Sequence, residues 1–151
     1  MSRKDANAKE RELIEQLRSI PLLKVECARC QMYLEELREM LEQMNRFPAP
    51  FRDNQFEQMK AELLEDLKKG ETQFYQKTLE QWYCRQKAEV MIEALPDLRE
   101  RLILHLRYLD GLSWDEVIEG LKKYSLFYEQ RQVARLHKAA IAALAERFGE
   151  M

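Results

Sequence analysis

Apolar residues recur at helical spacing through the first part of the chain. A first stripe is formed by Leu13, Leu17 and Ile20. A second stripe steps by 4-3-4-3, which is heptad spacing, and consists of Cys30, Leu34, Leu37, Leu41 and Met44. These repeats predict amphipathic helices. Between the stripes, Pro21 predicts a kink or a break, because a proline inside a helix loses a hydrogen bond and clashes with the preceding turn.

A loop and a second long helix are expected next. The stretch RFPAPFRDN, residues 46–54, contains two prolines and several turn formers, so it is predicted to be a loop. Beyond it, large apolar residues are again spaced as on a helix: Phe56, Met59, Leu63, Leu67, Phe74 and Trp82. Gly70 weakens this helix by about 1 kcal/mol relative to alanine. The pattern therefore predicts an antiparallel, coiled-coil-like hairpin over residues 1–94.

A lone hairpin has too small a core to bury these apolar stripes. We therefore expect a homo-oligomer, specifically a dimer joined through the N-terminal helices. The alternative is that the hairpin packs against the C-terminal part of the chain and buries the same residues there.

The pattern changes at residue 95, where shorter elements begin. Leu-Pro-Asp at 95–97 opens a helix on which Leu98, Leu102, Leu106 and Leu109 fall on one face. Gly111 is expected to end it in a left-handed conformation. Ser113 and Glu116 then form a capping box for a short helix. That helix buries Val117, Ile118 and Leu121 and closes at Lys122 and Lys123.

The last helix has two different faces. Its apolar stripe consists of Val133, Leu136, Ala140, Ile141 and Leu144. On the opposite side lie Arg131, Ala134, Arg135 and Lys138. Two helices joined by a turn, the second with a basic outer stripe, are typical of a helix-turn-helix that reads double-stranded DNA. The alternative interpretation is that the basic stripe is only a solvated face.

Charge limits where a DNA-binding surface can lie. The formal net charge is −2, residues 1–94 carry 16 basic and 18 acidic side chains, and residues 95–151 carry 9 of each. Any DNA-binding surface must therefore be a local patch. High charge with only four glycines and four prolines also favours long helices over sheets, so the fold class is expected to be all-α.

Other functional classes find little support. Cys27 and Cys30 form a C-x-x-C, but no second pair follows and both histidines are distant, so they are interpreted as packing residues. There is no phosphate-binding loop and no ordered set of catalytic side chains, so we expect no enzyme activity, no cofactor and no metal. The first residues lack an apolar core, no apolar run could span a bilayer, and three cysteines suit a reducing compartment. A cytoplasmic protein without a membrane partner is expected.

Residues 95–116 and 133–140 resemble region 4 of bacterial sigma factors. The first stretch has a Leu-Pro opening, an Arg-Leu-Ile-Leu core, Leu-Arg-Tyr and then G-x-S-x-x-E, and VARLHKAA looks like the recognition helix. A helical first half before such a module also resembles phage and prophage regulators of the ArpU/RinA type, in which Tyr-Ser precedes a V-x-R-L-H-like helix. No part of this sequence resembles the segments of sigma factors that bind the −10 element of a promoter.

The resemblance implies promoter binding through the last helix. The implied base-facing positions are Gln130, Arg131, Ala134 and Arg135, with Lys138 reaching a phosphate. Gln132, Lys122 and Lys123 complete the expected DNA-binding residues. The segment before Val133 is longer than the family pattern by about one helical turn, through Leu126–Glu129. Either the recognition helix begins a turn early, or a loop bulges there.

The sequence thus predicts two domains. Residues 1–94 form the hairpin for oligomerisation or interaction, and residues 95–151 form the DNA-binding helix-turn-helix. The expected function is a phage- or prophage-type transcriptional regulator that binds promoter or operator DNA. The alternative is an assembly or interaction factor, binding host RNA polymerase or a packaging component through the same helical module.

Overall fold

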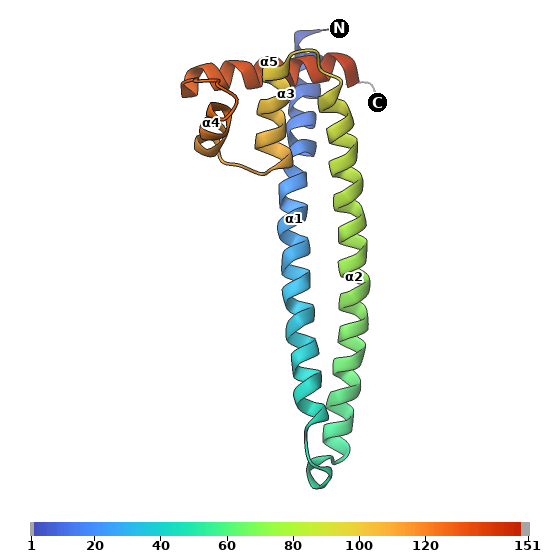
Figure 1. Cartoon of the computed structure of the whole chain (residues 1–151). Helices are drawn as coiled ribbons and strands as arrows, with labels where there is room; N and C mark the ends of the chain where they lie inside the picture. Colours follow the sequence, from blue (N-terminus) through green and yellow to red (C-terminus); the bar gives the residue numbers. More distant parts are fainter. Residues whose placement is uncertain (1, 149–151) are drawn as a thin grey trace. The chain divides into compact units, whose positions relative to one another are not determined.

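The computed structural model describes residues 2–148, which form an all-α structure without a β-strand (Figure 1). The expected fold class is confirmed for this part of the chain; Met1 and residues 149–151, the end of the expected C-terminal domain, lie outside it. The α-helices are α1 (Arg3–Asn45), α2 (Asn54–Glu93), α3 (Leu98–Leu104), α4 (Trp114–Lys122) and α5 (Gln130–Phe148). A 3₁₀ turn, η1 (Ala49–Phe51), and a π-helix, η2 (His105–Leu109), complete the elements.

The proline within α1 does not end that helix. Pro21 lies inside the continuous segment Arg3–Asn45. Leu17 and Ile20 before it are buried in the core, so packing offsets the hydrogen bond that the proline cannot donate. Of the two outcomes expected at Pro21, a kink or a break, the break is therefore wrong, because Ile20 and Leu23, buried on either side of the proline, outweigh its local preference.

The chain packs as two compact units. Among the described residues, one unit consists of residues 23–81, and the other combines residues 2–22 with residues 82–148. Both α1 and α2 run through the two units. The ends of the two long helices thus share a unit with α3, α4 and α5, whereas the boundary expected from the sequence falls later, at residues 94 and 95.

The unit of residues 23–81 is an antiparallel helical hairpin (Figure 1). Its buried residues are Leu23, Cys27, Leu34, Leu37, Phe56 and Leu63. A Cβ atom added at Gly70 would lie only 2.9 Å from Leu34 Cδ2. The glycine therefore allows the two helices to approach closely, which offsets its weak helix propensity. Ion pairs join the helices at Lys77–Glu26 (3.0 Å) and Arg38–Glu71 (3.4 Å).

The second unit has its core where the ends of α1 and α2 meet the C-terminal helices. The buried cluster consists of Leu13, Leu17, Ile20, Ala88, Ile92, Leu95, Leu104, Tyr108, Leu109, Ala140, Ile141 and Leu144. The first apolar stripe of the sequence is thus buried within the chain itself. For this stripe, packing against the C-terminal helices is the correct alternative.

The helix that follows Asp97 starts after Pro96 rather than including it, and only part of its expected apolar face is buried. Asp97 is its N-cap, accepting a hydrogen bond from the Arg99 N–H, and Pro96 lies just before the cap. The π-helix η2 then shifts the register, with Asp110 N–H donating to the His105 carbonyl at 2.9 Å. Tyr108, within η2, is buried, whereas Leu98, in the first turn of α3, is exposed.

Candidate nucleic-acid interface

The turn before α4 has the predicted geometry. Gly111 has a φ of 70°, in the left-handed region that glycine adopts readily. The Ser113 hydroxyl accepts a hydrogen bond from the Glu116 N–H at 3.2 Å, and the Glu116 carboxylate accepts one from the Ser113 N–H at 3.1 Å. These bonds hold the pKa of the Glu116 carboxyl below its usual value. The capping box is confirmed, and it fixes where α4 begins.

A second buried cluster joins α3, α4 and α5. Ile103 comes from α3, Val117 and Leu121 from α4, and Val133 from α5. Gly120 lets α4 approach the preceding helix, because a Cβ atom there would lie 3.3 Å from Leu106 Cδ1. This packing supports α5 from the side opposite to its basic stripe.

The extra residues before α5 form a loop. Residues 126–129 are not helical, and α5 begins at Gln130. Ser125 has a φ of 62°, and the Leu126 N–H donates to the Leu121 carbonyl at 3.1 Å. Leu126 and Tyr128 pack against the second buried cluster. The insertion therefore bulges as an anchored loop rather than lengthening the last helix.

The two faces of α5 differ as the sequence predicts. Val133, Ala140, Ile141 and Leu144 are buried. Arg131, Arg135 and Lys138 are exposed, and none of the three takes part in an ion pair among residues 2–148. In Figure 1, α5 runs crosswise to α3. The three cationic groups thus form an exposed stripe, called the basic stripe below.

The other candidate residues are exposed but not equivalent. Gln132 uses its side-chain oxygen to accept a hydrogen bond from the Glu129 N–H at 2.9 Å, which caps the start of α5. Lys122 pairs with Glu119 at 2.7 Å, whereas Lys123 is the C-cap of α4. Gln130 and Ala134 lie at the rim of a small cavity. Gln132 and Lys122 therefore already have contacts within the chain.

An aromatic cluster that the sequence does not reveal lies under α5. His137 Nε2 is 2.7 Å from Tyr108 Oη, and the Trp114 ring meets the imidazole edge-on at 4.8 Å. The Arg107 guanidinium lies 4.5 Å from the centre of the Trp114 ring. Burial, together with the charges of Arg107 and Arg18, lowers the pKa of His137 to about 4. The imidazole of His137 is therefore neutral near pH 7, and it packs against Tyr108 and Trp114.

The cavity beside this cluster is small and mostly apolar. Its volume is about 270 Å³. Its lining comes from α4 (Trp114, Ile118) and α5 (Gln130, Val133, Ala134, His137), and Ile118 is half-buried there.

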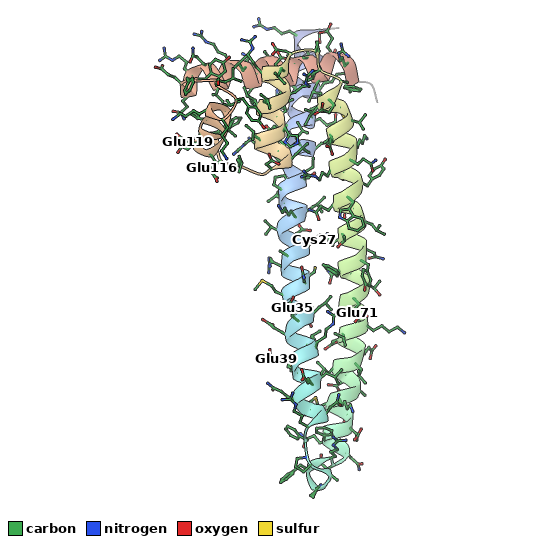
Figure 2. All side chains as sticks on the ribbon, viewed as in Figure 1. Cys27, Glu35, Glu39, Glu71, Glu116 and Glu119 are labelled. Carbon is green, nitrogen blue, oxygen red and sulfur yellow. The ribbon has the colours of Figure 1, made fainter. Side chains whose placement is uncertain are left out.

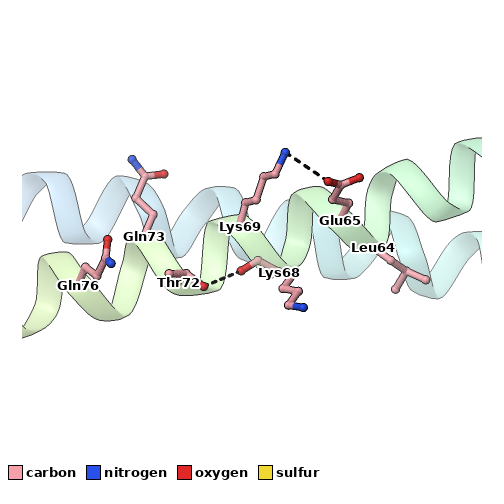
Figure 3. A pocket seen from close by; sticks show the side chains of 7 residues that line it. All are labelled: Leu64, Glu65, Lys68, Lys69, Thr72, Gln73 and Gln76. Atoms are coloured by element: carbon pink, nitrogen blue, oxygen red, sulfur yellow. Dashed lines mark hydrogen bonds and ion pairs between the residues drawn. The ribbon is translucent and has the colours of Figure 1, made fainter.

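A hollow along α2 does not bring functional groups together. Figure 3 shows its lining side chains pointing outward along a single helix, where Lys69 pairs with Glu65 at 3.5 Å. The Thr72 hydroxyl donates to the Lys68 carbonyl at 3.1 Å, a contact that also stays within the helix. No group of three or more metal-ligating side chains occurs among residues 2–148. Cys27 and Cys30 are unbridged residues one turn apart on α1.

Comparisons with protein-family models, curated proteins and solved structures give no match to this chain. Within residues 2–148, no helix has an apolar stretch long enough to cross a membrane. The function of the candidate interface is therefore inferred from its side chains and their geometry.

Proposed function

We propose that the protein is a transcriptional regulator of the phage or prophage type, which binds double-stranded promoter or operator DNA through α5. The observation that carries this proposal is the basic stripe. Arg131, Arg135 and Lys138 are exposed and without ion pairs among the described residues, on a helix whose opposite face is buried against α3 and α4. An exposed cationic helix supported by a capped preceding helix suits the major groove.

The residues have separate roles in this proposal. Arg131 and Arg135, four residues apart, face the bases, where an arginine can bond a guanine edge with two hydrogen bonds. Gln130 and Ala134 are next to them on the base-facing side. Lys138, one turn further on, meets a phosphate, and Lys123 reaches the backbone from the end of α4. Gln132 and Lys122 contribute less, because both are engaged within the chain.

The proposed regulator acts as a homodimer. Large apolar side chains remain exposed on the hairpin unit, among them Val25, Met32, Tyr33, Tyr75 and Leu79. Apolar surface of this kind commonly marks an interface. Light scattering at micromolar concentration is expected to give twice the chain mass, and a strict monomer would refute the dimer.

DNA binding is tested by selecting sequences from a random duplex pool and measuring the affinity of the selected site against salt concentration. A triple variant, Arg131→Ala, Arg135→Ala and Lys138→Ala, is expected to abolish binding while remaining folded. A control with the same loss of charge replaces three exposed residues of the hairpin unit by alanine: Lys24, Arg29 and Lys68. The proposal fails if both variants bind alike, or if affinity does not fall with rising salt.

A second candidate function is a protein-interaction or assembly factor, with host RNA polymerase or a packaging component as the partner. The balance of 9 basic and 9 acidic side chains in residues 95–151 favours it, because DNA-binding domains are generally basic. If the triple variant binds DNA as well as the unchanged chain does, this function replaces the first.

A further inference from the structure

The connection between α1 and α2 has a defined structure. Arg52 donates hydrogen bonds from Nη2 to the Asn45 carbonyl at 2.7 Å and from Nε to the Phe47 carbonyl at 2.9 Å. Asp53 accepts a hydrogen bond from the Phe56 N–H at 2.8 Å and so caps the start of α2. Side chains thus hold the main chain on both sides of η1, and they fix the groups that the connection presents to solvent.

These groups are large and apolar. Phe51 is 66% exposed, Met59 55%, Met40 52% and Phe47 47%, although a short polar turn would be sufficient to join two helices. They surround a hollow of about 440 Å³ whose base is Phe56, stacked on Phe47 at a ring distance of 5.4 Å. Methionine side chains adapt to irregular apolar partners, and exposed aromatic rings give binding energy when they are covered.

The surroundings of this hollow are acidic. Residues 35–69 form the end of the hairpin beyond the contact between Leu34 and Gly70. They carry 9 acidic and 6 basic side chains, a net charge of −3. The basic groups are largely engaged: Arg38 with Glu71, Arg46 with Glu42, Lys69 with Glu65, and Arg52 with main-chain carbonyls. Glu35 and Glu39, one turn apart on α1, have no ion pair among the described residues (Figure 2).

We propose that residues 35–69, the hairpin tip, form a docking surface for an amphipathic helix of a partner protein that carries lysine or arginine beside its apolar face. The apolar side of that helix would cover Phe51, Met59 and Met40, as other helices cover Met-rich grooves. Its basic residues would face the acidic side chains beside the hollow, such as Asp53, which lines it, and Glu39, which is next to Met40 on α1. This surface is separate from the basic stripe, and it does not depend on DNA binding.

Charge favours this occupant over two others. A second copy of the chain would place one tip of net charge −3 against another, and like charges in close contact are unfavourable. An anionic membrane surface would meet the same repulsion, since membrane-binding segments are usually rich in lysine and arginine. A helix with basic residues beside an apolar stripe satisfies both the apolar hollow and its acidic surroundings.

The test measures binding of fluorescent model peptides of about 18 residues to the full chain by anisotropy. One peptide has leucine on one helical face and lysine on the other, and a second has glutamate in place of lysine. The leucine–lysine peptide is expected to bind the double variant Phe51→Gln, Met59→Gln at least about tenfold more weakly than it binds the unchanged chain. A matched control, Leu64→Gln with Val90→Gln, removes two exposed apolar groups of α2 that neither line the hollow nor belong to the residues named for the proposed dimer. It is expected to bind like the unchanged chain.

Several results would overturn the proposal. Equal binding of the leucine–glutamate peptide would show that charge plays no part. Equal losses in the tip variant and the control would show that the peptide binds any apolar surface. If the tip variant changes the mass by light scattering, the occupant is a second copy. Binding to phosphatidylserine vesicles that requires Phe51 would identify a lipid surface instead. Circular dichroism of each variant confirms that the helices are intact, which is expected because the replaced side chains are exposed.

Discussion

Protonation of His137 is expected to weaken the unit that contains α5. The imidazole of His137, on α5, is half-buried beside Tyr108 and Trp114. The positive charges of Arg107 and Arg18 also disfavour its protonated form. Burial and both charges disfavour the protonated ring, so its pKa falls to about 4 in the folded chain. In the unfolded chain the pKa is about 6.5. Neutral His137 therefore makes its full contribution to the free energy of unfolding well above pH 6.5. This contribution is lost as the pH falls from 6.5 through 4.

The size of the effect follows from these two pKa values. Between pH 7 and pH 5.5 the unfolded chain takes up most of a proton at this position, whereas the folded chain takes up almost none. Linkage then removes about 1 kcal/mol of the free energy of unfolding, after allowance for the part of the ring that water still reaches. For a chain of this length, that loss lowers Tm by about 2–4 °C.

The assay compares the unchanged chain with His137→Gln, which can still bond the Tyr108 hydroxyl but does not titrate. Unfolding is followed by the fluorescence of Trp114 in a Trp82→Phe background, since Trp82 is exposed and would add a second signal. Only the chain with His137 is expected to show the additional fall in Tm between pH 7 and pH 5.5. Equal pH dependence of the two proteins, or an imidazole NMR titration of His137 with its midpoint near 6.5, would refute the reasoning.

Four further substitutions test other parts of the structure. Ser113→Ala is expected to lower the free energy of unfolding by about 1 kcal/mol through loss of the cap, and an unchanged Tm would contradict this. Gly70→Leu should destabilise the hairpin unit by about 1–3 kcal/mol by displacing Leu34, and chemical denaturation followed by circular dichroism measures it. If α5 reads DNA, Arg135→Ala should weaken specific binding more than non-specific binding, whereas Lys138→Ala should weaken both and lower the salt slope by about one unit; binding titrations at several salt concentrations separate the two.

The sequence predicts those features that depend on local chemistry. The capping box at Ser113 and Glu116, the left-handed Gly111 and the inner face of α5 all follow from residue type and spacing. Each depends on contacts within a few residues or on the helical repeat. For the same reason the exposure of Arg131, Arg135 and Lys138 on the outer side of α5 could be predicted from the sequence.

Features that depend on packing between distant segments could not be predicted from the local sequence. Pro21 does not end α1, because the core buries the residues around it. The π-helix η2 shifts the helical register, and Tyr108 within it is buried and reaches His137. Gly70 is recognisable as a weak helix former in the sequence, but its closeness to Leu34 depends on how the two helices are paired. In each case a distant contact outweighs a local preference.

The net charge of −2 conceals two regions of opposite sign. Residues 35–69 have a net charge of −3, whereas α5 carries four basic side chains and one acidic, a net charge of +3. Overall composition therefore argues neither for nor against a nucleic-acid partner, because the charges nearly cancel when summed. Electrostatic attraction acts over about 8–10 Å at physiological salt, so a partner responds to the local region that it approaches. DNA would be attracted to α5 and repelled by the hairpin tip, and a basic helix would show the reverse preference. The two proposed surfaces thus select different partners without needing a net charge of either sign.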